Sequence, residues 1–334
     1  MKLSICIPTF NRATVLKHCL DSIVASLKDH EWLEICISDN ASIDDTVEVI
    51  KRYQDKLPIT FSSNNENIGL ARNVLEVTQL ARGDFIWLVG DDDYLMPDAL
   101  DRLYEIMHDP SHKDIKFFYN NAFTVGSMDE ILEKEGDFNS CDFKAMLCSA
   151  ENQKTEFLKL IDHNISWDFL GGMFMSIFHA ESWRSGLANI DQEQLLKPGT
   201  FSSLENTFVH LKVFPCAFKE SKAFINYTPI IIATSDSRDW SSYWYIVHSR
   251  WLIAALEEYR KHGLSFLQFI KNKNKTLEKF APYFVMILWN KKKYGLLWSD
   301  LFRMLAKNFL YPNFYLSIFY PLYFAAKRLS KEQR

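Results

Sequence analysis

The chain has 334 residues, of which 48% are hydrophobic and 24% charged, and its formal net charge is −4. The hydrophobic share is sufficient for a large core, and the scarcity of Gly (11) and Pro (10) excludes fibrous and disordered classes. The charge is unevenly distributed, because Arg260 to Arg334 contains 15 Lys and Arg residues, three acidic residues and 17 aromatic residues. An acidic body with a basic, aromatic tail predicts that the tail contacts an anionic surface.

Short apolar runs alternate with amphipathic stretches over roughly the first 120 residues. The runs predict strands at Leu3–Pro8, Glu34–Ser38, Ile59–Ser63, Phe85–Val89 and Ile115–Tyr119. The stretches between them predict helices at Ala13–Leu27, Thr46–Tyr53, Leu70–Ala81 and Pro97–Met107. Asp44 or Asp45 is expected to cap the second helix, and Pro97 to lie in the first turn of the fourth. This alternation predicts a parallel α/β sheet that binds ligands beyond the carboxyl ends of its strands.

The pattern changes after residue 125. An acidic, loop-like insertion is expected at Gly126–Ser140, and it is followed by helical stretches around Phe143–Ala150 and Thr155–His163. Further on, we expect a strand at Phe169–Phe178, a helix at Leu204–Phe214 and a strand or strand pair at Phe224–Thr234. From Trp240 onward nearly everything reads as helix, so a subdomain boundary is expected near residue 236.

The uncharged stretch from Asn308 to Ala326 leaves three interpretations open. Its length of 19 residues would suffice for a membrane span, but Pro312 and Pro321 would kink such a helix. Aromatic residues next to basic ones favour contact with the membrane interface. Ordinary buried helices or oligomer packing are the third interpretation.

Cysteine usage and the N-terminus predict a cytoplasmic location. The six cysteines are scattered without a CxxC pair, which is typical of reduced thiols. The apolar run that begins at Met1 is too short for a signal peptide and is expected to form the first strand.

Polar residues follow each of the first four predicted strands, and in a parallel sheet these turns open on one edge. The triplet Asp91-Asp92-Asp93 directly follows an apolar strand, and carboxylates in such a place need a cation such as Mg²⁺ or Mn²⁺. Arg12 and Arg72 lie on neighbouring turns and could bind a diphosphate. Asp39 could accept a hydrogen bond from a base or a ribose, or could cap a helix.

Four segments in this order, IPTFNR, SDNASIDDT, NNENIGLARN and GDFIWLVGDDDYLMPDAL, resemble the nucleotide-binding half of family 2 glycosyltransferases, which have the GT-A fold. The segments GGMFMSIFHAESW and SLENTFVHLKVF are similar to bacterial O-antigen and capsule enzymes of the abequosyltransferase type. The resemblance implies a Rossmann-like, mainly parallel sheet flanked by helices. It assigns residues 1–125 to the nucleotide-sugar half, 126–235 to the acceptor half, and 236–334 to a helical, basic-aromatic tail.

The resemblance also implies the roles of particular residues. Nucleotide contacts are expected from Pro8, Thr9, Phe10, Arg12, Asp39, Asn67, Arg72 and Asp91. Asp92 and Asp93 are expected to bind Mn²⁺ or Mg²⁺, and Asp92 to take part in catalysis. The family motif is commonly Asp-x-Asp-Asp, and here its first position is Gly90. Metal dependence is therefore expected but not assured by the motif.

The family inverts the anomeric centre and takes the acceptor proton on an acidic pair, which corresponds here to Glu205-Asn206. Because an amide cannot act as a base, Glu205 is the leading candidate, with a helix-start or salt-bridge role as the alternative. His210 and Asp168 are weaker candidates for the base. Four tryptophans of the second half are candidate sugar platforms, although a tryptophan more often belongs to the core: Trp167, Trp183, Trp240 and Trp244.

The expected partners are a nucleoside-diphosphate sugar, a glycan acceptor on a polyprenyl diphosphate, and the inner membrane surface through the tail. Homo-oligomerisation is left open, and nucleic acid is not expected because the body is acidic. Two other classes stay open. A nucleotidyltransferase would need a Gly-rich, Lys-containing loop after the first strand, which IPTFNR lacks, whereas Gly90 and Asn206 are compatible with a binding protein that has lost catalysis.

Overall fold

A computed structural model describes residues 1–28, 31–126, 131, 143–148, 150–199, 201–234 and 242–321. The chain divides into two compact units. The first, here called the sheet unit, consists of Met1–Leu160, Gly172–Asn189 and Cys216–Arg238. The second, here called the helical unit, consists of Ile161–Gly171, Ile190–Pro215 and Asp239–Arg334.

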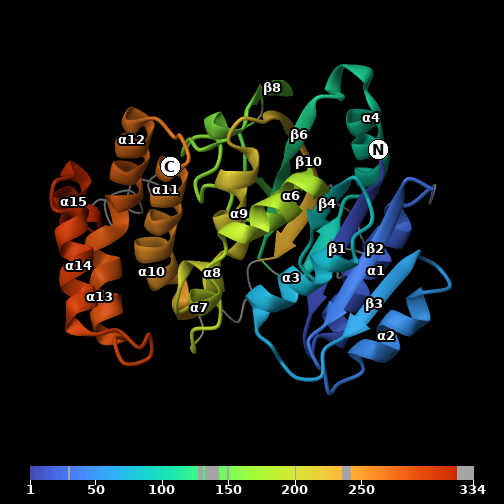
Figure 1. Ribbon diagram of the computed structural model, residues 1–334, viewed down its shortest axis with the longest axis horizontal. Helices are drawn as coiled ribbons and strands as arrows, with labels where there is room; N and C mark the ends of the chain where they lie inside the picture. Colours follow the sequence, from blue (N-terminus) through green and yellow to red (C-terminus); the bar gives the residue numbers. More distant parts are fainter. Residues whose placement is uncertain are drawn as a thin grey trace, which may run out of the picture. The chain divides into compact units, whose positions relative to one another are not determined.

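The sheet unit alternates strands and helices through its first hundred residues (Figure 1). Its strands are β1 (Leu3–Thr9), β2 (Leu33–Asp39), β3 (Ile59–Ser63), β4 (Phe85–Leu88), β5 (Asp93–Leu95), β6 (Ile115–Val125), β7 (Lys144–Ala145), β8 (Gln153–Glu156), β9 (Ser176–His179) and β10 (Lys222–Thr234). Its helices are α1 (Ala13–Ser26), α2 (Thr46–Tyr53), α3 (Leu70–Leu80), α4 (Ala99–His108) and α6 (Ala180–Gly186).

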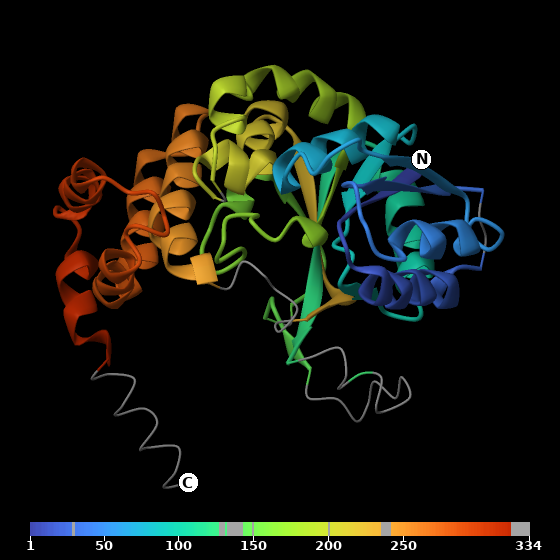
Figure 2. The ribbon, with the colours of Figure 1, turned by 90° about the horizontal axis from the view of Figure 1, so that it is seen from below.

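The strands form one mixed sheet in the order β3-β2-β1-β4-β9-β6-β10-β5, with β7 paired to β6 and β8 to β10. The first four strands of this order are parallel, and β9 runs antiparallel to both β4 and β6. All seven residues of β1 are buried, as expected for a central parallel strand covered on both faces. Figure 2 shows α1 and α3 on opposite faces of this part of the sheet. The predicted α/β class is confirmed.

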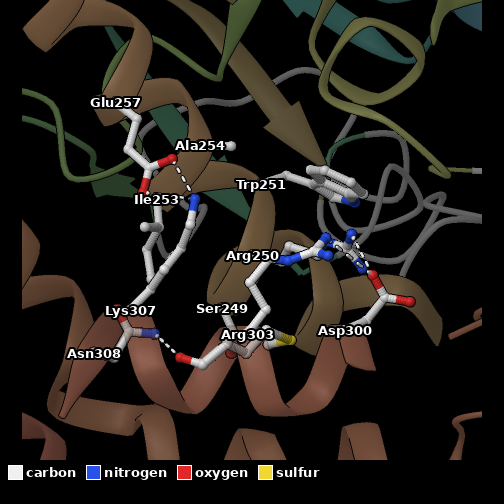
Figure 3. Close-up of a pocket in the computed structure, with 11 residues that line it drawn as sticks. Ser249, Arg250, Trp251, Ile253, Ala254, Glu257, Asp300, Arg303, Lys307 and Asn308 are labelled. Carbon is white, nitrogen blue, oxygen red and sulfur yellow. Dashed lines mark hydrogen bonds and ion pairs between the residues drawn. The ribbon is translucent and has the colours of Figure 1, made fainter. Parts of the chain in front are cut away.

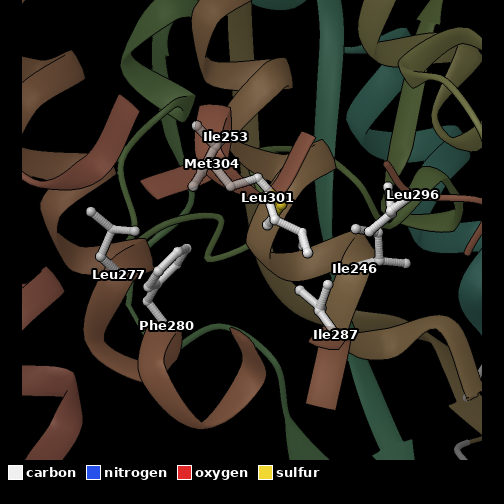
Figure 4. Close-up of a cluster of buried hydrophobic side chains, with 8 residues drawn as sticks. All are labelled: Ile246, Ile253, Leu277, Phe280, Ile287, Leu296, Leu301 and Met304. Atoms are coloured by element: carbon white, nitrogen blue, oxygen red, sulfur yellow. The ribbon is translucent and has the colours of Figure 1, made fainter. Parts of the chain in front are cut away.

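The helical unit contains α7 (Gln192–Leu195), α8 (Leu204–Thr207), the start of α9 (Val209–Phe218), α10 (Trp244–Ile246), α11 (Leu252–Lys261), α12 (Phe266–Thr276), α13 (Phe280–Trp289), α14 (Trp298–Asn308) and α15 (Pro312–Leu316). A π-helical turn, Val247–Trp251, joins α10 to α11. Residues from α10 to α14 build a core of their own (Figure 4): Ile246, Ile253, Leu277, Phe280, Ile287, Leu296, Leu301 and Met304. This region is therefore a folded body with its own buried cluster.

The structure corrects or narrows several sequence-based expectations for residues 1–125. Pro97 precedes the fourth helix, which begins at Ala99. The second helix begins at Thr46, and Asp44 rather than Asp45 bonds to the backbone N–H of Thr46, at 3.1 Å. β6 continues to Val125, because β10 pairs with it along most of its length.

The larger errors lie after residue 140. No helix forms in the described residues around Phe143–Ala150, where the edge strand β7 pairs with β6. Residues 153–156 form β8 along β10, and a short 3₁₀ helix, Phe157–Leu160, follows. The strand expected at Phe169–Phe178 begins only at Ser176. In each case pairing with a neighbouring strand, which local periodicity does not reveal, decided the conformation.

Two other expectations are answered only in part. The helix at Leu204–Phe214 is divided at Phe208, whose φ is −136°, into α8 and α9. Most of the acidic insertion at Gly126–Ser140 and the end of the stretch Asn308–Ala326 lie outside the described residues. The part from 308 to 321 forms short helical pieces and not one straight helix, as the kinking effect of proline led us to expect. No helix in the described ranges is long and apolar enough to cross a bilayer. The five cysteines in those ranges are free.

Candidate active site

The first four parallel strands bring their following loops to one edge of the sheet unit, here called the carboxyl edge. Thr9, the last residue of β1, is in register with Asp39 at the end of β2, and Asp39 with Ser63 at the end of β3. The backbone joins these ends, since the N–H of Asn40 donates to Thr9 O at 2.9 Å and the N–H of Asn64 to Asp39 O at 2.8 Å. Residues far apart in sequence therefore form one surface.

The aspartate triplet lies at this edge and is tied to the loop after β1. The Thr9 hydroxyl donates to Asp91 Oδ2 at 2.8 Å. The Arg12 guanidinium contacts Asp91 Oδ1 and Asp92 Oδ2, each at 3.2 Å. The structure thus brings together four predicted site residues from two loops in one charged network.

Burial separates the roles of the two carboxylates. Asp91 is 5% exposed, and this burial raises its pKa to about 7, although the Arg12 guanidinium acts in the opposite direction. The Asp92 side chain keeps 19% of its surface exposed. Asp92 is therefore the member of the pair that is open to a ligand.

The third carboxylate of the triplet points back to the chain. Asp93 is 5% exposed, and its Oδ2 accepts the backbone N–H of Gly90 at 2.8 Å. A Cβ atom at Gly90 would lie 2.7 Å from Asp92 Oδ1 and 2.9 Å from Asp93 Oδ2. The glycine thus leaves room for the carboxylates of the next residues, which gives a physical reason why the first acidic position of the motif is missing.

Mg²⁺ and Mn²⁺ suit this donor set. Both are hard cations that a protein binds through one or two carboxylates, with water and substrate phosphates completing the shell. Asp92 offers an oxygen ligand of this kind at the open side of the network. No group of three His, Cys, Asp or Glu side chains in the described ranges could hold a metal unaided. The residues fit a metal that arrives with a phosphorylated ligand.

An asparagine network at the same edge was missed by the sequence interpretation. Asn73, which is 2% exposed, accepts from Ser38 Oγ at 2.7 Å and donates to Ser38 O at 3.0 Å. The Asn40 amide donates to Asn67 Oδ1 at 2.9 Å, and Asn64 donates to both Asn40 and Asn73. Of its four asparagines only Asn67 was a predicted site residue, and the cluster of asparagines after β2 and β3 was the available signal. The network fixes the loops that follow these two strands.

The remaining predicted nucleotide contacts differ in exposure. Pro8 is buried within β1, whereas Phe10 is 37% exposed. Asp39 is 1% exposed and accepts the N–H of Ser42 at 3.2 Å, so in this structure it holds its own turn. Arg72 lies in the first turn of α3, and no ion pair joins it to a residue in the described part of the chain.

In the helical unit, the candidate base Glu205 is buried in an ion-pair cluster. Glu205 is 5% exposed and lies 3.3 Å from Lys212 Nζ, which also lies 3.2 Å from Glu258. Its neighbour Asn206 accepts the N–H of Phe201 at 2.9 Å and donates to Lys197 O at 3.4 Å. An aspartate could not make the second of these bonds, so Asn206 has a structural task that requires an amide.

The two weaker base candidates differ. Burial lowers the pKa of His210 to about 4, and its Nε2 lies 3.2 Å from the carbonyl oxygens of Leu170 and Gly171. That nitrogen must carry a proton to bond to carbonyls, which leaves it unable to accept another. Asp168 accepts from Ser166 Oγ at 2.9 Å and precedes two left-handed residues, Phe169 (φ 54°) and Leu170 (φ 71°). Such strained backbone is concentrated at functional sites.

The tryptophans that were proposed as sugar platforms fall into two groups. Trp183 is fully buried and donates to Thr78 Oγ1 at 3.2 Å, so it is a core residue, which was the favoured interpretation, and not a sugar platform. Trp167 is 37% exposed and stacks on His248, with 5.4 Å between the ring centroids. Trp244 stacks on the same imidazole, with 3.7 Å between the ring centroids. Trp240 lies outside the described residues.

Residues 4–134 match the family model described as Glycosyl transferase family 2. The abequosyltransferase RfbV of Salmonella typhimurium is 44% identical over 102 residues, which are 30% of this chain and 31% of that protein. A Campylobacter jejuni enzyme, GalNAc(5)-diNAcBac-PP-undecaprenol beta-1,3-glucosyltransferase, is 30% identical over 162 residues, or 47% of each chain. The chain thus spans less than half the length of these relatives. The predicted resemblance is confirmed: residues 4–134 match the model of family 2 glycosyltransferases, and bacterial glycosyltransferases are homologues over part of the chain.

Solved structures extend the likeness of fold over nearly the whole chain. Staphylococcus aureus TarS 1-349 in complex with UDP-GlcNAc has a TM-score of 0.58 and 14% identity, with 96% of this chain and 92% of that chain covered. The mannosyltransferase PcManGT from Pyrobaculum calidifontis, in complex with GDP-Man and Mn²⁺, has a TM-score of 0.54 and 14% identity, with coverages of 98% and 87%. The fold is therefore that of the GT-A glycosyltransferases.

Proposed function

We propose that the chain is a glycosyltransferase that moves a sugar from a nucleoside diphosphate to a hydroxyl group of a glycan in bacterial surface polysaccharide synthesis. The observation that carries this proposal is the network of Thr9, Arg12, Asp91 and Asp92 at the carboxyl edge, within the residues that match the family 2 model. The relatives named as transferases of abequose and glucose support it.

The donor would lie along the carboxyl edge. Arg12 contacts both carboxylates, and its guanidinium N–H groups match the geometry of a phosphate group. Arg72 supplies a second cation, and the loops after β1 and β2 border the nucleotide base. Asp92, with Asp93 as a further predicted ligand, would hold Mn²⁺ or Mg²⁺. The bound ion would supply positive charge for the leaving diphosphate.

The acceptor hydroxyl must lose its proton, and Glu205 is the proposed base in an inverting transfer. Its carboxylate is occupied by the ion pair with Lys212, at 3.3 Å, so a rearrangement of this ion pair is part of the proposal. Asp168, presented before a strained turn, is the second candidate. Glu205→Gln should reduce turnover and spare donor binding. If turnover of Glu205→Gln were unchanged, another residue would be the base. Asp168→Asn would then test the second candidate in the same assay.

The helical region is proposed to lie on the cytoplasmic membrane surface, where a polyprenyl-diphosphate-linked acceptor would be reached. Sixteen of the 22 exposed large hydrophobic side chains in the described part of the chain lie between residues 266 and 319. Residues 260–321 also contain eleven Lys and Arg and two acidic residues. Soluble monomers rarely expose so much apolar surface, and anionic lipid attracts each cation by about 1 kcal/mol.

A panel of UDP-, GDP-, CDP- and dTDP-sugars, with and without Mn²⁺, tests the proposed function. The true donor should raise the melting temperature, because a ligand of the native state stabilises it by mass action. The same donor should release nucleoside diphosphate when an acceptor is present. Binding without release or hydrolysis would favour the alternative, a nucleotide-sugar-binding protein without catalysis, for which the Asn206 position is the motivating observation.

A further inference from the structure

A lysine in the helical unit lies between two carboxylates, one of which belongs to the proposed base. Lys212 Nζ lies 3.3 Å from Glu205 Oε1 and 3.2 Å from Glu258 Oε2. Glu205 lies in α8, Lys212 in α9 and Glu258 in α11, so folding brings three charged groups together from three helices. The proposed function uses only the first of these contacts.

The cluster is largely buried, and its charges balance. Glu205 and Glu258 are 5% and 8% exposed, and the Lys212 side chain keeps 14% of its surface exposed. Glu258 also contacts Lys261, at 2.5 Å, whose side chain is 65% exposed. No other ion pair joins these four residues to the described part of the chain. Two carboxylates therefore face two ammonium groups.

Lys212 stays charged in these surroundings. Burial disfavours its charge, but the carboxylates of Glu258 and Glu205 outweigh the burial and raise the pKa of Lys212 above its ordinary value. Burial likewise acts to raise the pKa of Glu258, but Lys261 and Lys212 lower it overall. Lys212 and Glu258 are therefore both ionised at neutral pH.

The balance of charge changes when the base takes up a proton. In the proposed transfer, the acceptor oxygen forms a bond to the anomeric carbon, the bond from that carbon to the phosphate oxygen breaks, and its electron pair leaves with the diphosphate. The proton of the acceptor hydroxyl passes to a carboxylate oxygen of Glu205, which becomes neutral. Lys212 alone would then be a largely buried cation without a counterion, which is strongly destabilising. Glu258 is the counterion that remains, at 3.2 Å from the same ammonium group.

We propose that Glu258 and Lys212 are positioning residues for the base: Lys212 holds Glu205 before the transfer and is held by Glu258 once the proton has arrived. This inference rests on the proposed function of Glu205, and it names the partner toward which the Glu205–Lys212 ion pair rearranges. Without Glu258, Lys212 would stay on Glu205, and the carboxylate of Glu205 would be a weaker base.

The pH dependence of kcat/KM in the full chain tests this inference. Glu258→Gln should move the acidic limb to lower pH by about one unit and reduce the plateau by about tenfold, because Lys212 then pairs with Glu205 alone. Lys261→Met should move the limb the opposite way, since Glu258 then attracts Lys212 without competition. Lys261 is exposed, so this variant should fold even if Glu258→Gln does not. A role in stability alone would move neither limb.

Glu257→Gln is the matched control. Glu257 is the neighbouring residue on α11 and also forms an ion pair with a lysine, Lys307, at 2.8 Å (Figure 3). No ion pair in the described ranges joins Glu257 to Lys212. The pH profile of this variant should equal that of the unaltered chain.

Infrared titration gives a second measurement that needs no substrate. The difference between the unaltered chain and Glu205→Gln isolates the band of the protonated Glu205 carboxyl group. In the Glu258→Gln background this band should appear only at lower pH, because the charge that opposed ionisation of Glu205 is gone. In the Glu257→Gln background it should appear at the pH of the unaltered chain.

The outcomes separate this inference from the proposed function. An unshifted band or, in an active chain, an unshifted pH profile of Glu258→Gln would overturn the inference and leave Glu205 as the base. Full turnover of Glu205→Gln would contradict the base assignment itself, and the inference would fall with it. A shifted band in a chain that transfers no sugar would support the coupling of the three residues and refute the proposed transfer.

Discussion

The carboxyl edge of the sheet unit and the helices of residues 242–321 differ in which side chains they bury and which they expose. At the edge, three aspartates, Asp39, Asp91 and Asp93, are at most 5% exposed, and the apolar residues of β1 and β2 are buried. In the helices, sixteen large apolar side chains are exposed while charges are paired, as in Arg250–Asp300. Buried acidic side chains suit a site that receives a cation, and exposed apolar side chains suit a surface that contacts lipid.

The largest expected effect concerns the edge. Asp92→Asn keeps the size of the side chain but removes the charge that would hold the metal, and turnover should fall by about 10²–10³-fold. A steady-state assay of nucleoside diphosphate release measures this effect. Asp55→Asn, an exposed position in the same unit, is the control and should change nothing. Equal activity of the two variants would show that Asp92 holds no metal that the reaction needs.

The next effect concerns the helices. Three apolar residues are highly exposed there: Leu267 (80%), Trp289 (87%) and Leu310 (79%). Replacing them with serine should weaken binding to anionic vesicles by about tenfold per residue. Sedimentation with vesicles of phosphatidylglycerol measures it. Ile43→Ser is the matched control, because Ile43 is 93% exposed but lies in the sheet unit. Retained vesicle binding by the triple variant, with dimers in solution, would assign the surface to a second copy of the chain.

His210 is a buried ionisable group within the helical unit, and it should make the free energy of unfolding depend on pH. Its pKa is about 4 in the fold and 6.5 ordinarily, so the unfolded chain binds more protons as the pH falls below 6.5. The fold should lose about 2 kcal/mol between pH 7 and pH 5 through this residue. Denaturant unfolding at the two pH values should show a smaller loss for His210→Gln. The same slope in both proteins would contradict the assignment.

The smallest effect tests the room that Gly90 leaves for the carboxylates. Gly90→Ala places a Cβ 2.7 Å from Asp92 Oδ1, so the carboxylate must shift and donor affinity should fall by roughly tenfold. Calorimetric titration with the identified donor measures the change. Gly295→Ala has a strained backbone, at φ 61°, but open space, and should reduce stability without altering donor affinity. A loss of affinity in both variants would point to a general effect of folding.

Most elements of the first hundred residues were predictable because they are decided locally, whereas the short strand β5 was missed because it pairs with β10, more than 130 residues further along the chain. The bounds expected for α2 and β3 are those observed, and β1, β2, β4, α1 and α3 differ by one or two residues at an end. In such βα units the buried strands are nearly continuous apolar runs and the helices have a clear apolar face. The motifs at the strand ends follow from the same regularity, since parallel strands place their following loops on one edge.

The sequence by itself determined the fold class, the four loops of the carboxyl edge, and the basic, aromatic character of the tail, because these depend on residue type and short-range order. Only the tertiary structure decided that β7 and β8 are strands, since their partners lie about 20 and 70 residues away in the chain. It also decided that Asn206 is bonded to the backbone, that Trp183 is buried, and that Lys212 lies between Glu205 and Glu258. Contacts between distant residues determine burial and bonding partners, and no local pattern records them.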